Sequence, residues 1–225
     1  MSEETEDIKM SVWDAERGGW FTEYIVQNKK LYNHAERTIR FPTRKFAPIA
    51  MLQSRITDFP YQSWKLRCID ECTALLDLET KRLRLVLEIT PLQMKLIDCD
   101  EPALAHLANK EGLTPGYLLQ ELTKCGILLM PRDDDAALAG IELKDRQAEE
   151  RAIADVALGV RAFHFRSCKW NMTRDPENPG VSSDTVLMRI RENLEYDAEF
   201  EEDYEPDWRY IMWWNNKCSF VEGCK

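Results

Sequence analysis

Residues 64–97 read WKLRCIDECTALLDLETKRLRLVLEITPLQMKLI, a series of closely spaced apolar runs. The runs lie at 64–69, 74–78, 83–89 and 92–97, and in several of them apolar and polar residues alternate. A period of two is typical of a strand with one buried face. The spacing leaves no room for helices between the runs, which favours antiparallel pairing in a sandwich or barrel.

The same pattern occurs on both sides of this stretch. Upstream, residues 20–26 and 38–41 are rich in aromatic and β-branched side chains, which favour strands. Downstream, residues 162–166, 186–190 and 208–214 alternate again or form short apolar runs. We therefore expect strands along most of the chain.

Between these strands the apolar spacing becomes helical. Asp100 can cap the first helix of an insertion at about 100–125, and Thr114 followed by Pro115 is a typical start for its second helix. Apolar residues at near-helical spacing predict one longer helix at about 144–160. The expected fold class is α+β: a mainly antiparallel β-sandwich with a helical insertion and one longer helix.

The charge is unevenly distributed. The 225-residue chain has 30 Lys and Arg against 40 Asp and Glu, a formal net charge of −10. Residues 192–207 contain nine acids and residues 1–7 contain four, without any Lys or Arg, so the rest of the chain carries +3. An acidic chain disfavours general binding to nucleic acid or to anionic membranes, because both need clustered basic residues.

These features divide the chain into four expected parts. They are an acidic mobile N-terminus at 1–17, a β-rich globular domain at 18–191, an acidic segment at 192–207 and a Trp-rich closing strand with the C-terminus at 208–225. The acidic start is unlike a secretory signal or transit peptide, and seven cysteines fit reduced thiols. We therefore expect an intracellular protein.

No sequence pattern indicates catalysis. His34, His106 and His164 are not at metal-ligand spacing from another His or Cys. Cys168 could be imagined as a nucleophile with His164, but residues four apart on a strand are about 13 Å apart. The acids at 133–135 fit a solvated turn better than a cation-binding loop. The sequence predicts no enzymatic activity, no cofactor and no metal.

Aromatic residues are candidates for partner contacts. In the strand expected at 208–214, the even-numbered residues share one face and Trp213 lies on the other. Either this is a core strand with one aromatic face buried, or Trp213 lies in a partner interface, where Trp is enriched. In 192–207, aromatic residues alternate with acids, which favours a partner-facing segment. The candidate partner-binding residues are Trp208, Tyr210, Trp213, Trp214, Tyr196, Phe200, Tyr204, Tyr61 and Trp64.

Several stretches, taken in order, carry a resemblance to a known family. The most specific is Pro60–Arg67, PYQSWKLR. The others are Gly19–Thr22, Arg37–Phe41 with Phe46–Ile49, Leu113–Leu122, Gly126–Pro131 and Phe163–Asn171. Together they resemble the C-terminal domain of the axonemal dynein intermediate chain seven family, also called the cancer susceptibility candidate one family.

The resemblance implies a ciliary, microtubule-associated protein that belongs to an axonemal dynein complex or helps to assemble it. We therefore expect a non-catalytic structural or adaptor subunit of the cilium or flagellum axoneme, present in the cytoplasm before assembly. Its expected partners are axonemal dynein subunits or other axonemal proteins, with tubulin as a further candidate. The alternative is a cytoplasmic co-chaperone-like factor for dynein assembly. Family members are usually much longer and carry a charged helical region before this domain, whereas about 17 residues precede it here.

Overall fold

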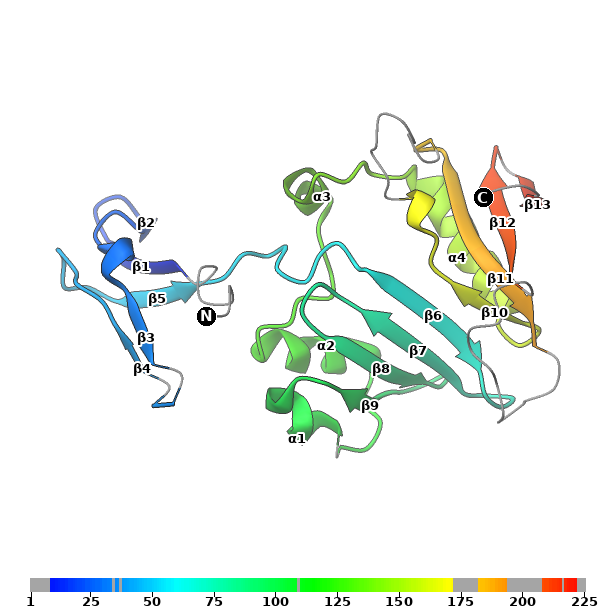
Figure 1. Ribbon diagram of the computed structural model, residues 1–225, viewed down its shortest axis with the longest axis horizontal. Helices are drawn as coiled ribbons and strands as arrows, with labels where there is room; N and C mark the ends of the chain where they lie inside the picture. Colours follow the sequence, from blue (N-terminus) through cyan, green and yellow to red (C-terminus); the bar gives the residue numbers. More distant parts are fainter. Residues whose placement is uncertain are drawn as a thin grey trace. The chain divides into compact units, whose positions relative to one another are not determined.

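The computed structural model describes residues 9–33, 35–36, 38–108, 110–171, 182–193, 208–215 and 217–221. The chain forms two compact units, Met1–Thr57 and Asp58–Lys225, and each has its own sheet (Figure 1). The division after Thr57 falls inside the single β-rich domain expected at 18–191. Alternation along the sequence indicates strands, but it does not show which strands pair with one another.

The smaller unit contains a three-stranded antiparallel sheet in the order β2-β1-β5. Its elements are β1 (Lys9–Asp14), β2 (Gly19–Phe21), the 3₁₀ turn η2 (Gln27–Lys29), β3 (Leu31–Asn33), β4 (Thr38–Arg40) and β5 (Ile49–Leu52). Residues 9–14 were expected in the acidic mobile N-terminus, and this part of the prediction is wrong. Met10 and Val12 of β1 are buried with Ile25 in the core of the unit, which holds the strand in the sheet.

The larger unit contains an eight-stranded antiparallel sheet in the order β13-β12-β11-β10-β6-β7-β8-β9. Its strands are β6 (Ser63–Cys68), β7 (Ala74–Glu79), β8 (Arg84–Ile89), β9 (Met94–Cys99), β10 (Phe163–Arg166), β11 (Thr185–Glu192), β12 (Arg209–Trp214) and β13 (Lys217–Val221). Strands β6 to β9 follow one another as neighbours, as the short spacing in 64–97 predicted. The strands from the last third of the chain extend the sheet beyond β6.

The helices of the larger unit lie between β9 and β11 in the sequence. They are the 3₁₀ turn η3 (Pro102–Leu104), α1 (Ala105–Ala108), α2 (Pro115–Lys124), α3 (Asp133–Ala139), α4 (Arg146–Gly159) and the 3₁₀ turn η4 (Lys169–Asn171). The predicted α+β fold of mainly antiparallel strands is confirmed, with α1 and α2 in the insertion and α4 as the longer helix. No helix in the described ranges is long and apolar enough to cross a membrane.

Helix α3 lies where the sequence predicted a solvated acidic turn, and that prediction was wrong. Its first turn consists of Asp133, Asp134 and Asp135, and carboxylates are favourable at the positive end of a helix. Asp135 is buried and accepts a hydrogen bond of 2.7 Å from the backbone N–H of Arg132. Gly140 ends the helix with a left-handed φ of 70°, a conformation that glycine adopts readily.

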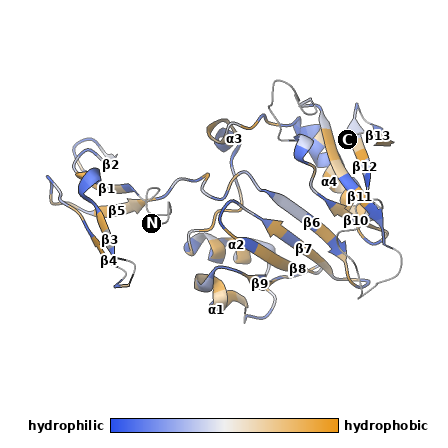
Figure 2. Cartoon of the chain, in the orientation of Figure 1, coloured by the Kyte–Doolittle hydropathy of each residue, from blue (hydrophilic) through white to orange (hydrophobic). Residues whose placement is uncertain are grey.

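Helices α1, α2 and α4 cover one face of the eight-stranded sheet. Leu104, Leu107, Leu118 and Leu122 of the insertion pack with buried leucines of β7, β8 and β9. Ala152 of α4 packs with Phe165 and Trp213. The cross-strand pairing places all these strand residues on the same face, and Figure 2 shows apolar and polar residues alternating along several strands.

Candidate partner-binding surfaces

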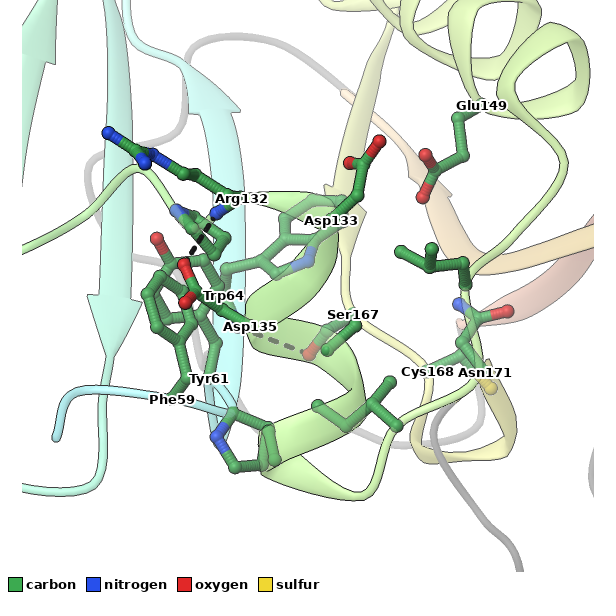
Figure 3. Close-up of a pocket in the computed structure, with 16 residues that line it drawn as sticks. Phe59, Tyr61, Trp64, Arg132, Asp133, Asp135, Glu149, Ser167, Cys168 and Asn171 are labelled. Carbon is green, nitrogen blue, oxygen red and sulfur yellow. Dashed lines mark hydrogen bonds between the residues drawn. The ribbon is translucent and has the colours of Figure 1, made fainter. Parts of the chain in front are cut away.

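A pocket of about 440 Å³ opens in the larger unit beside the start of β6 and helix α3 (Figure 3). Phe59, Tyr61 and Trp64 lie on one side of it, and Glu149 and Asn171 lie across from them. The rest of its lining is mainly apolar and includes Pro60, Pro131, Ala136, Ala139, Ile141 and Leu143. This volume is in the range of sites that hold small ligands, so the pocket can accept an apolar side chain of a partner.

Tyr61 is fixed as a wall of this pocket. Its hydroxyl donates a hydrogen bond of 2.6 Å to the carbonyl oxygen of Leu129, and its ring centroid lies 4.8 Å from that of Phe59. Burial raises the pKa of Tyr61 well above its ordinary value, so the hydroxyl stays neutral. The ring therefore offers a preorganised apolar surface, which lowers the entropic cost of binding.

Trp64 is equally well fixed. It packs against both buried clusters of the larger unit, one under the insertion and one under α4. Its backbone N–H donates to Oγ of Ser167 at 3.1 Å, and its carbonyl oxygen accepts from the N–H of Ser167 at 2.9 Å. The structure thus brings Tyr61 and Trp64 together in one pocket. Their role as partner-binding residues stays a prediction.

Charged side chains also line the pocket. Arg132, Asp133 and Glu149 line its polar part, and burial raises the pKa of Glu149. Cys168 also lines the pocket and is buried. Within the described ranges, no group of three or more His, Cys, Asp or Glu side chains is arranged to hold a metal ion. The pocket is therefore lined by both apolar and charged side chains, and protein interfaces also combine the two.

The aromatic residues of β12 lie on two different faces. Trp213 is 1% exposed in the core under α4, so it offers no area to a partner and its placement in an interface was wrong. Trp213 packs instead with Ile211 in the helix-covered core, as in the alternative of a core strand with one aromatic face buried. Trp214 is 47% exposed, whereas Trp208 is buried and Tyr210 half-buried.

Three candidate residues lie outside the described ranges: Tyr196, Phe200 and Tyr204. The acidic segment that contains them therefore stays a prediction. Sequence reasoning also missed part of the pocket, since Ala136 and Ala139 belong to helix α3, which was not expected. The sequence does contain a signal for that helix: three acids are followed by an alanine-rich stretch and then by Gly140, a typical residue at the end of a helix.

No protein-family model matches the chain. Curated relatives do: dynein axonemal intermediate chain 7 of Bos taurus is 27% identical over 209 residues, and that of Homo sapiens is 28% identical over 209 residues. Both alignments cover 92% of this chain. A dynein axonemal intermediate chain 7 homolog of Ciona intestinalis is 23% identical over 202 residues, 88% of this chain. The chain spans just over a quarter of the length of these relatives, 28%, 27% and 27%.

Proposed function

Because the chain belongs to the dynein axonemal intermediate chain 7 family, we propose that it is a non-catalytic adaptor subunit of the ciliary or flagellar axoneme. It associates there with axonemal dynein through protein–protein contacts. The observation that carries this proposal is the similarity over 92% of the chain, which includes residues of both compact units. Its partners are other dynein subunits or neighbouring axonemal proteins, including tubulin of the microtubule wall.

Two features of the larger unit support an adaptor role. The pocket beside Tyr61 and Trp64 suits an apolar anchor residue from a partner, and such anchors dominate binding energy in many interfaces. Strand β13 is an edge of the eight-stranded sheet and carries Phe220, which is 56% exposed. An edge strand can pair with an extended segment of another chain.

The test of this proposal is the location of the tagged full-length chain in ciliated cells. After detergent removes the membrane, we expect the chain to remain with the axonemes and to cross-link to dynein subunits, as identified by mass spectrometry. An outer-arm heavy chain and a soluble cytoplasmic protein serve as positive and negative controls. Recovery only from the cell body would contradict an adaptor subunit and would favour the alternative, an assembly factor.

A further inference from the structure

Two carboxylates in the pocket beside Tyr61 and Trp64 have no partner among the described residues. Asp133 is the first residue of α3, and Glu149 lies in the first turn of α4. Both line the pocket, and within the described part of the chain neither side chain forms a hydrogen bond or an ion pair. Figure 3 shows the two carboxylates as neighbours in the pocket.

The position of Glu149 is unfavourable for a negative charge. Partial burial raises the pKa of its carboxyl, the charge of Lys144 lowers it, and the charges of Asp133 and Asp145 raise it further. Asp133 and Glu149 therefore repel each other across the pocket. A cation placed between two such carboxylates relieves this repulsion.

Other polar side chains of the pocket have partners within the chain. The side chain of Asn171 donates to the carbonyl oxygen of Leu187 and accepts from its N–H, and the hydroxyls of Tyr61 and Ser167 are also hydrogen-bonded. Among the described residues that line the pocket, Arg132 alone is basic, and Figure 3 shows its guanidinium pointing away from the two unpaired carboxylates. The charges that a ligand can match are therefore negative.

The starts of two helices do not by themselves account for these acids. A helix start favours acids, but Asp134 also lies in the first turn of α3 and does not line the pocket. In α4 the cap is Asp145, which accepts a hydrogen bond of 3.0 Å from the N–H of Ala148. Neither helix needs a carboxylate that faces the pocket.

An arginine side chain matches this combination of groups. A guanidinium is planar, so it can stack on an aromatic ring such as that of Tyr61 or Trp64 and donate parallel hydrogen bonds to carboxylates. Its methylene groups can lie against the apolar walls of the pocket. A purely apolar side chain would fill the same space but would bury the carboxylates of Asp133 and Glu149 without a partner, which is costly.

We propose that the pocket beside Tyr61 and Trp64 binds an arginine side chain of a partner protein, with Asp133 and Glu149 accepting hydrogen bonds from its guanidinium. This inference deepens the proposed function and rests on it for the role of the pocket as a partner site. The chemistry itself can be measured on the purified full-length chain.

The probe is a peptide of about five residues, acetylated and amidated, with Arg at its centre and Ala elsewhere, so that it spans no more than about 18 Å and carries one charge. In amide and indole NMR spectra of the full-length chain, its addition should shift the signals of Trp64, Ala136 and Ala139, which line the pocket. The shifts should saturate at millimolar peptide, and the affinity should fall as salt is raised.

Peptides that differ only at the central residue identify the group that the pocket recognises. Citrulline keeps the shape of arginine without its charge and should bind at least about tenfold more weakly, because charge-assisted hydrogen bonds are lost. Lysine keeps the charge but is not planar, and should bind about threefold more weakly. Leucine represents a purely apolar anchor and should also bind more weakly than arginine.

Variants of the full-length chain locate the site. Asp133→Asn with Glu149→Gln should weaken binding of the arginine peptide at least about tenfold. Asp134→Asn with Glu150→Gln is the matched control, because it removes the same charge from the next residues of α3 and α4, which do not line the pocket. It should change the affinity by no more than about twofold. Unchanged signals in the rest of the spectrum show that each variant folds.

Four results would overturn the proposal. They are the absence of a saturable shift, shifts confined to residues outside the pocket, equal weakening by the two double variants, and a citrulline, lysine or leucine peptide that binds as tightly as the arginine peptide. The test of the proposed function has a separate outcome. Arginine binding by a chain recovered only from the cell body contradicts the adaptor role alone, whereas axonemal retention of a chain that does not bind arginine contradicts this inference alone.

Discussion

Nε1 of Trp213 donates a hydrogen bond of 2.9 Å to Oδ2 of Asp155 and so joins strand β12 to helix α4. The indole is 1% exposed and packs with Ala152 and Phe165. Trp213→Ala opens a large cavity and removes a donor from Asp155, so we expect a loss of roughly 3–5 kcal/mol in the free energy of unfolding. Urea denaturation followed by circular dichroism measures this loss.

Trp214 is the matched control for this prediction, because it is the next residue in β12 but is 47% exposed. Trp214→Ala should cost no more than about 1 kcal/mol. Trp213→Phe keeps much of the volume and loses the hydrogen bond, so its cost should be intermediate. Similar losses for Trp213→Ala and Trp214→Ala would contradict the assignment of the helix-covered core face to Trp213.

Asp58 and Arg82 form a buried ion pair that we expect to stabilise the larger unit. Asp58 is 1% exposed and accepts hydrogen bonds from Nε and Nη2 of Arg82 at 2.9 and 3.1 Å, and from the N–H of Leu128 at 3.2 Å. Asp58→Asn removes the charge and at least one acceptor position. We expect a loss of at least about 2 kcal/mol in unfolding free energy, because hydrogen bonds to charged groups are strong. Chemical denaturation measures it.

Asp77 provides the comparison, since it pairs with Arg84 in a more exposed setting. Asp77→Asn should cost about 1 kcal/mol or less, because water screens such a pair. Equal costs at Asp58 and Asp77 would show that burial does not set the strength of the first pair.

His164 should make the larger unit sensitive to acid. Its pKa is lowered from 6.5 to about 4, chiefly by burial, so below about pH 6.5 the unfolded chain binds a proton that the folded chain does not. Stability should therefore fall as the pH decreases from 6.5 towards 4, and His164→Gln should reduce this dependence. Denaturation midpoints at pH 7 and at about pH 5 measure the effect. An unaltered slope in the His164→Gln variant would contradict the prediction.

Local sequence signals were enough for elements that depend on neighbouring residues. Thr114 and Pro115 do mark the start of α2, and the alternation from Trp64 to Ile69 corresponds to strand β6. Features that depend on which strands pair could not be predicted from the sequence. Lys65, Arg166 and Arg189 form a row only because β10 pairs with both β6 and β11, and no spacing rule relates residues so far apart. Likewise, alternation in β12 separates Trp213 from Trp214 but does not show which face α4 covers.

The proposed role of the pocket beside Tyr61 and Trp64 in partner binding can be tested by filling the pocket with a larger side chain. Substituting Tyr61 or Trp64 would instead alter the residues that line it. Ala139 lines the pocket and Ala137 lies exposed on the same helix, α3. Ala139→Trp should occupy the space of a partner's anchor residue, and loss of such an anchor costs about 2 kcal/mol, roughly a thirtyfold decrease in affinity. Retention of the tagged chain in washed axonemes, and its recovery with dynein subunits, should fall accordingly.

Ala137→Trp adds the same side chain to the solvent side of α3 and should leave retention unchanged. Because both variants replace Ala with Trp on one short helix, a difference between them cannot come from helix propensity. Comparable thermal midpoints for the two variants show that both fold. If Ala139→Trp is retained as well as Ala137→Trp, the pocket does not receive the axonemal partner, and the exposed edge strand β13 becomes the surface to alter next.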